Sequence, residues 1–283
     1  MNIKVRKILD IFIATVVVLA VILVIFYHER QKRIEYLFNA MSEGDVEAAK
    51  TLLTKDSSLA NAKSHKCKEY GWSPYNWSPI FYLSIKKDVN KNQVEIVKLL
   101  IAKGANVKSK DEYAKTALHY VNSKDIALLL LAHGADVNAC DGEGLTPLHQ
   151  AVKENRVKIA ELLILKGADV NARDKALWSP LHYVRSKDAA KLLLSKGADI
   201  NARTDGGLTP LHTVFRWQRD KSQERALIEL VEFLISKGAD VNARADSGET
   251  PLKECLGWAK SNNLGTETTV EIEDLLRKHG AKE

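Results

Sequence analysis

Cysteine is scarce in this chain of 283 residues, which contains only Cys67, Cys140 and Cys255. The three lie far apart in the sequence, and none belongs to a CxxC pair. A disulfide framework uses paired cysteines, and a structural zinc site uses cysteine and histidine at short spacing. We therefore expect neither, and we interpret the cysteines as small, partly buried side chains.

The sequence also lacks the motifs of catalysis and cofactor binding. It contains no P-loop, no dinucleotide-binding fingerprint and no GxSxG elbow. Residues 141–144 (Asp-Gly-Glu-Gly) have the glycines of a calcium loop but not its alternating carboxylates or its distant glutamate. We predict no catalytic residue, no metal, no cofactor, no small-molecule substrate and no enzyme activity.

The excess of basic residues is concentrated at the N-terminal end of the chain. Residues 1–33 contain six of the 42 lysines and arginines and two of the 36 acidic residues, within a net charge of +6. The remainder, with 36 basic and 34 acidic residues, is nearly neutral. A nucleic-acid-binding domain would carry a concentrated basic face, so we expect no nucleic-acid partner.

One long apolar run is present, IFIATVVVLAVILVIF from Ile11 to Phe26. Its neighbours extend it to about the 20 residues that a helix needs to cross a membrane. We predict a transmembrane helix over 8–27, between a basic tail (1–7) and a basic juxtamembrane linker (28–33). A cleaved signal peptide and a buried helix remain as alternatives, although bulky residues precede any cleavage point and basic residues frame the run. The framing residues are Lys4, Arg6, Lys7, Arg30, Lys32 and Arg33.

The orientation of this helix is weakly encoded. Three basic residues and the amino terminus precede it, whereas the three that follow are accompanied by Glu29 and Glu35. The positive-inside rule then favours a cytoplasmic N-terminus and places the rest of the chain on the non-cytoplasmic side, the periplasm in a bacterium. The unpaired cysteines favour the opposite orientation. We adopt the first.

Beyond the apolar run, two short motifs alternate along the chain. The first starts at positions separated by 38, 30, 33, 30 and 41 residues. The second, of the form GADVNA, follows each of its first five copies. The first motif is SPIF at Ser78–Phe81, TALH at Thr116–His119, TPLH at Thr146–His149, SPLH at Ser179–His182, TPLH at Thr209–His212 and TPLK at Thr250–Lys253. The second begins at Gly104, Gly134, Gly167, Gly197 and Gly238. Such self-similarity predicts a stack of repeats, since one unit cannot bury its apolar face alone.

These linked motifs resemble the ankyrin repeat, over residues 34–283. The resemblance implies an all-α ankyrin-repeat solenoid of helix-turn-helix units with short β-hairpin fingers, here preceded by one transmembrane helix. We expect about seven units, including degenerate N- and C-terminal caps. Two copies are three residues short, which we attribute to a trimmed turn between their helices. In this family the motif histidine is a structural hydrogen-bonding residue, and the resemblance implies that role for His119, His149, His182 and His212.

Partners of similar ankyrin proteins lie on the fingertips and on the exposed face of the first helices. The resemblance therefore implies a membrane-tethered scaffold that binds an unknown protein partner, or alternatively a regulatory or protective accessory subunit of a nearby enzyme. It is equally open that the tryptophans only stabilise the stack. The candidate contact residues are Tyr75, Trp77, Tyr113, Glu143, Leu145, Arg173, Trp178, Arg203, Leu208, Arg244 and Glu249, with Trp217 in the longer fifth repeat.

Overall fold

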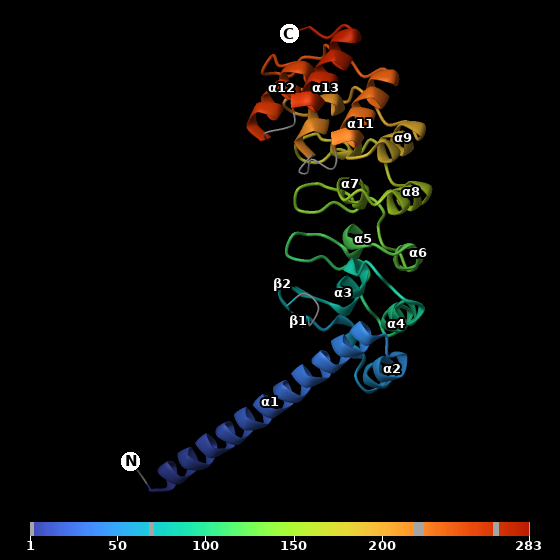
Figure 1. Ribbon diagram of the computed structural model, residues 1–283. Coiled ribbons are helices and arrows are strands. Elements are labelled where there is room, and N and C mark those ends of the chain that lie inside the picture. The colour runs from blue at the N-terminus through green and yellow to red at the C-terminus, as the bar shows by residue number, and fades with distance from the viewer. Residues whose placement is uncertain (1–2, 68–70, 218–223, 263–265, 283) are drawn as a thin grey trace. The chain divides into compact units, whose positions relative to one another are not determined.

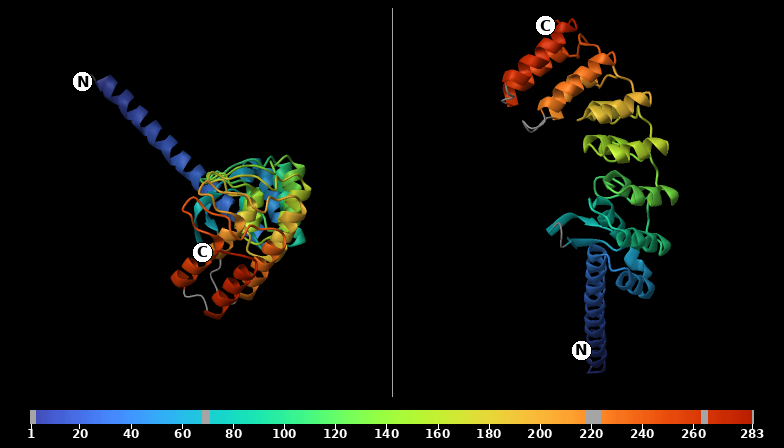
Figure 2. Two further views of the ribbon diagram at one scale, coloured as in Figure 1. Left: turned by 90° about the horizontal axis from the view of Figure 1, so that it is seen from above. Right: turned by 45° about the vertical axis from the view of Figure 1, so that its right-hand side comes forward.

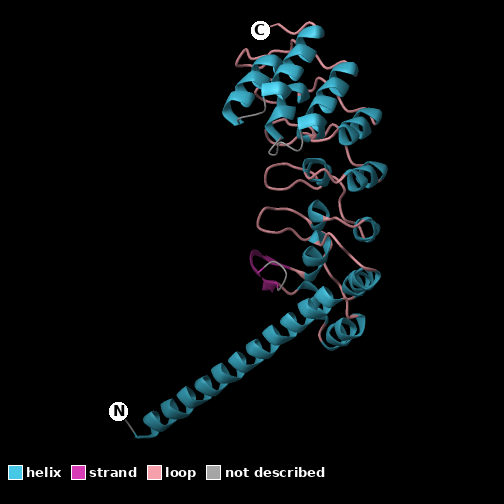
Figure 3. Cartoon of the chain, in the orientation of Figure 1, coloured by secondary structure: helices cyan, strands magenta, loops and turns pink. Residues whose placement is uncertain are grey.

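The computed structural model describes residues 3–67, 71–217, 224–262 and 266–282, with side chains except at 3–11, 64–67, 71–76, 217, 260–262 and 266. The chain divides into two compact units. The first comprises residues 1–83 and 88–106, and the second comprises residues 84–87 and 107–283. Figure 3 shows that helices and loops account for nearly all of the described chain, with strands in a single hairpin. The helical fold predicted from the sequence is confirmed.

The first unit begins with one helix of 41 residues, α1 (Ile3–Glu43). Between Phe12 and Glu43 it contains an 18-residue window with a mean hydropathy of 2.4, none of it buried. By length and composition this helix could cross a membrane. Figure 1 shows its N-terminal part extending alone beyond the other helices of its unit. The helix runs unbroken through residues 28–33, the segment expected to be a linker.

The last turns of α1 are part of the first repeat. Ile34, Leu37, Phe38 and Met41 are buried, with the spacing of one helix face. They pack against α2 (Val46–Lys55) and α4 (Lys91–Ala102). Gln93 Nε2 donates hydrogen bonds to the carbonyls of two residues near the end of α1, at 3.1 Å each. The apolar helix is therefore anchored in the core of its unit without an intervening joint.

The finger of the first unit is the one β-hairpin among the described residues. It follows η1 (Ser57–Asn61) and consists of β1 (Ser64–Cys67) and β2 (Gly71–Trp77), paired antiparallel. The register pairs Cys67 with Gly71 and Ser64 with Trp77, and shifts between them. Helix α3 (Pro79–Ile85) begins directly after it, with proline at a position where a helix needs no N–H.

The second unit is two rows of stacked helices. Figure 2 shows the successive pairs as parallel layers. First helices pack on first helices and second helices on second helices. The first row contains α5 (Ala117–Tyr120), α7 (Pro147–Lys153), η2 (Pro180–Tyr183), α10 (Pro210–Thr213) with η3 (Val214–Trp217), and α12 (Pro251–Asn262). The second row contains α6 (Lys124–Ala132), α8 (Val157–Leu165), α9 (Lys187–Ser195), α11 (Glu224–Ser236) and α13 (Thr266–Lys278).

The two short copies differ from the expectation in where they lose residues. Helix α7 has seven residues, whereas α5 and η2 have four. Three residues separate α5 from α6, as three separate α7 from α8. The trimmed segment is thus the first helix itself and not the turn. A single turn suffices because its buried side chains, Leu118 and Leu181 among them, still reach the core.

Asparagine side chains join the loops of consecutive repeats. Asn171 Nδ2 donates to the carbonyl of Gly197 at 3.0 Å, while its Oδ1 accepts from the N–H of Asp199 at 2.9 Å. Asn138, Asn201 and Asn242 make the same pair of bonds to the next loop. Each bond satisfies a backbone carbonyl or N–H group of the loop that follows a second helix. The joints of the stack are therefore hydrogen-bonded as well as apolar.

Candidate functional site

Five fingers project from the second unit, at residues 111–115, 141–145, 174–178, 204–208 and 245–249. Each is closed by a hydrogen bond from the N–H of its first residue to the carbonyl of its last, at 2.9 to 3.0 Å. In three of them the first residue is an aspartate whose Oδ1 accepts two further N–H groups, at 2.8 to 2.9 Å. The aspartates are Asp111, Asp141 and Asp174. Because these carboxylates accept hydrogen bonds from the backbone of their own finger, they stabilise its turn, which explains the preference for aspartate there.

The fingers are also bonded to one another. Backbone N–H groups donate to carbonyls of the preceding finger, from Gly142 to Tyr113 at 2.8 Å and from Lys175 to Glu143 at 3.0 Å. The same bond joins Asp205 to Ala176 and Asp246 to Gly206. Side chains at the tips therefore project from a continuous hydrogen-bonded row rather than from independent loops.

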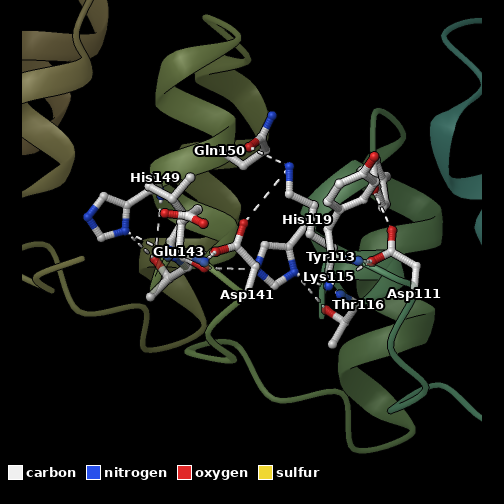
Figure 4. A network of polar contacts seen from close by, with 12 residues as sticks. Asp111, Tyr113, Lys115, Thr116, His119, Asp141, Glu143, His149 and Gln150 are labelled. Carbon is white, nitrogen blue, oxygen red and sulfur yellow. Dashed lines mark hydrogen bonds and ion pairs between the residues drawn. The ribbon is translucent and has the colours of Figure 1, made fainter. Parts of the chain in front are cut away.

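Side-chain contacts reinforce the row, as Figure 4 shows for its first two fingers. Lys115 Nζ lies 3.9 Å from Asp141 Oδ2 and 3.4 Å from Gln150 Oε1. Further along, Arg173 Nη1 donates to the carbonyl of Arg203 at 2.8 Å, and Arg203 Nη2 donates to that of Arg244 at 2.7 Å. The arginines predicted to contact a partner thus also connect the bases of adjacent fingers.

The motif histidines lie beneath the fingers and have the structural role that the resemblance implies. Each Nδ1 accepts from the N–H of the Thr or Ser that begins the motif, at 3.0 to 3.1 Å. The proton is therefore assigned to Nε2. Each Nε2–H donates to a carbonyl of the next finger, at 3.0 to 3.2 Å. The acceptors are the carbonyls of Leu145, Trp178, Leu208 and Glu249.

Burial of these rings disfavours their charged form. Desolvation lowers the pKa of His119, His149 and His212 below 6.5, and lowers the pKa of His182 to about 4. Near neutral pH the rings are therefore neutral. Within the described part of the chain, no three histidine, cysteine, aspartate or glutamate side chains are placed to hold a metal ion.

The predicted contact residues differ widely in exposure. The side chain of Tyr113 is 54% exposed. Five charged candidates are also exposed: Glu143, Arg173, Arg203, Arg244 and Glu249. Trp178 and Leu208 are half-buried. The side chains of Tyr75 and Trp217 lie outside the described ones.

Two of the predicted contact residues require correction. Trp77 is 5% exposed and Leu145 is 6% exposed, so neither side chain can reach a partner in this structure. Both occupy the position just before the T/S-P-L motif, where burial differs from finger to finger, because Glu249 at the same position is exposed. Trp178 shares that position, and its ring lies 5.2 Å from that of Tyr183 and 5.7 Å from that of His182. Packing within the stack therefore accounts for much of its surface.

One exposed apolar residue of the fingers was not among the predicted contact residues. Leu177, at the tip of the 174–178 finger, is 48% exposed and has a φ of 58°. The corresponding residues of three other fingers are glycines, Gly144, Gly207 and Gly248. A comparison of the five finger sequences would have revealed an apolar side chain at a glycine position.

The two cysteines with described side chains have different environments. Cys255 is buried, and burial raises the pKa of its thiol to about 12. Cys140 is exposed at the base of the 141–145 finger. Cys67 falls outside the described side chains.

Comparison with known families agrees with this geometry. A family model described as "Ankyrin repeats (3 copies)" matches residues 81–174, and one described as "Ankyrin repeat" matches residues 177–205 and 206–246. Together these matches cover more than half of the 283 residues. A search of curated proteins found no match. The repeated motifs, the stacked helix pairs and the family matches lead to one conclusion, that the chain belongs to the ankyrin repeat family.

Proposed function

We propose that this protein is a membrane-tethered scaffold that binds a protein partner through the fingers of its second unit. Ankyrin repeats are generally protein–protein interaction modules, and no feature of the described residues points to a different use of this one. The observation that supports the proposal most is the hydrogen-bonded row of fingers, with Tyr113 more than half exposed upon it.

A pre-ordered row of this kind favours protein binding on energetic grounds. Because backbone bonds already fix the fingers, a partner does not have to order them, and less conformational entropy is lost on association. Tyrosine and arginine, both exposed on the row, are the residue types that most often dominate the free energy of an interface. The proposed contact residues are therefore Tyr113, Glu143, Arg173, Arg203, Arg244 and Glu249, with Trp178 and Leu208 at their edges.

Helix α1 supplies the proposed tether. Its apolar part is exposed along its length from Phe12 to Tyr27, which a soluble helix would avoid. Under this proposal the span is residues 8–27, and the repeats lie on the non-cytoplasmic side. The partner is then a protein in, or close to, the same membrane.

Site-specific photocrosslinking tests the scaffold role. A photoreactive phenylalanine analogue replaces Tyr113 in the full-length chain in its native membrane. We expect a discrete crosslinked band whose partner is identified by mass spectrometry. Leu165, 78% exposed at the end of α8, provides a matched control away from the fingers. Equal crosslinking from both positions, or from neither, would show that the finger row is not the binding surface.

A further inference from the structure

The 174–178 finger carries a side chain that its fold does not require. Residues at its fourth position adopt a positive φ in every finger of the second unit, from 58° to 83°. Three fingers use glycine there, since only glycine enters this region freely. Leu177 occupies it with a φ of 58°, a strained conformation for a branched side chain. Replacement of glycine by leucine therefore weakens the finger.

The space around this position differs among the fingers. A Cβ added to Gly144 would come within 2.9 Å of the backbone nitrogen of Lys175, and one added to Gly207 within 2.9 Å of that of Asp246. Those fingers cannot accept a side chain without movement. The 174–178 finger accommodates Leu177 and leaves 48% of it in solvent. The leucine is thus both strained and incompletely packed, so stability of the stack does not explain it.

The exposed charged side chains of this finger, and of the residue that precedes it, are of one sign. The carboxylate of Asp174 is buried and accepts from the N–H groups of Ala176 and Trp178 and from the hydroxyl of Tyr183. Arg173 and Lys175 are exposed. Arg173 Nη1 donates to the carbonyl of Leu177 at 2.5 Å, which places a guanidinium directly beside the apolar tip.

We propose that Leu177, Arg173 and Lys175 form a recognition tip for a protein segment in which an apolar side chain is flanked by carboxylates. The inference rests on the proposed scaffold function and specifies the part of the partner that the middle of the row binds. Strain tolerated at an exposed apolar side chain is typical of a position retained for binding. The two cations add complementarity to acidic flanks, which sets partner choice and the rate of association.

A peptide array tests this assignment with defined probes. The full-length chain in detergent is applied to short synthetic peptides with a central Leu, Ile or Phe flanked by Asp and Glu, and to matched peptides flanked by Lys. We expect the acidic set to bind, and added salt to weaken it. Leu177→Gly should reduce binding about ten-fold or more, as loss of a central interface residue does. Lys175→Glu should shift the preference toward the Lys-flanked set.

A stability measurement separates recognition from a structural role. Because glycine relieves the strain, Leu177→Gly should leave the melting midpoint unchanged or raise it by about 2–4 °C. Ala114→Gly relieves the same backbone position in another finger (φ 58°) and should not change peptide binding.

Three outcomes would overturn the inference: acidic peptides that bind Leu177→Gly as well as the native chain, equal binding of both peptide sets, or binding of neither. In each case crosslinking from Tyr113 still shows whether the fingers bind a protein partner. A wrong assignment of the recognition tip can therefore be distinguished from a wrong proposed function.

Discussion

At each joint between repeats of the second unit, one imidazole ring is hydrogen-bonded at both nitrogens. His149, for example, accepts from Thr146 and donates to the carbonyl of Trp178 at 3.1 Å. Protonation of Nδ1 would convert an acceptor into a donor that faces another N–H. Both that conflict and the burial of the ring oppose the charged form, so these residues make the stack sensitive to acid.

The four histidines predict a specific pH dependence of stability. Their pKa values are lower in the folded chain than in the unfolded chain, where 6.5 is expected. Below pH 6.5 the unfolded chain therefore binds more protons, and the free energy of unfolding falls as the pH falls. For each histidine the loss is at most about 1.4 kcal/mol per pH unit, reached between its pKa in the folded chain and its pKa in the unfolded chain. For His182, whose folded pKa is about 4, it reaches about 3 kcal/mol over the whole window.

Urea unfolding of the full-length chain in detergent, between pH 7.5 and pH 5, measures this slope. Glutamine cannot be protonated, so His182→Gln should lower the free energy of unfolding at pH 7.5. It should also reduce the number of protons taken up on unfolding, read from the slope against pH, by about one. A free energy of unfolding that stays constant from pH 7.5 to pH 5 would contradict the assignment.

Residue roles were predictable from the sequence where a repeated motif imposes them. The histidine role follows from its motif, because the same partners recur in every copy. The burial of Trp77 was not predictable, since it depends on the neighbours that surround one position of one finger. Leu177 was detectable in principle, as Asp-Lys-Ala-Leu-Trp differs from Asp-Gly-Glu-Gly-Leu at the glycine position. Its exposure and its φ required the structure.

At the scale of elements, helix α1 departs most from the expectation. The sequence shows where the apolar run ends, and the cluster of charges after Tyr27 suggests a linker. Those charges are compatible with helix, however, because lysine, arginine, glutamate and glutamine are good helix formers. Arg33 pairs with Asp56 at 3.6 Å, and Lys32 with Glu29 at 3.4 Å. The helix therefore continues until Gly44, whose φ of 74° ends it.

Limited proteolysis tests the continuity of α1. Trypsin needs an extended backbone in its active site, so Arg30, Lys32 and Arg33 should resist cleavage in the native chain although two of them are exposed. Two glycines inserted after Gln31 should break the helix and make this segment the first to be cut. Gel analysis with mass determination of the fragments distinguishes the cases. Rapid cleavage of the native chain at these residues would mean that a joint exists there.

At the scale of the whole molecule, the proposed tether makes the function depend on the side of the membrane that the repeats occupy. Flanking charges decide this only weakly, since both ends of the span carry three basic residues. The structure adds a reporter, because Cys140 is exposed whereas Cys255 is buried. A single accessible thiol in the second unit can therefore mark its compartment.

Labelling with a membrane-impermeant maleimide provides the measurement, in a Cys67→Ser background to leave Cys140 as the exposed thiol. We expect Cys140 to be labelled from the non-cytoplasmic side of intact membranes, without lysis. Cys67→Ser/Cys140→Ser serves as the control and should not be labelled. Labelling only after the membrane is opened to the cytoplasmic side would reverse the proposed orientation.

Under the proposed tether, the unbroken α1 also affects how a partner in the same membrane is found. A flexible linker would let the first repeat tumble, and part of the binding free energy would go into halting that motion. With a rise of about 1.5 Å per residue, the six residues between Tyr27 and Ile34 hold the first repeat roughly 10 Å from the end of the apolar span. In a membrane, its height and tilt are then set before any encounter. The effective concentration of the repeats is therefore raised for a partner whose binding site lies at that height. A partner whose site lies at another height cannot reach the repeats.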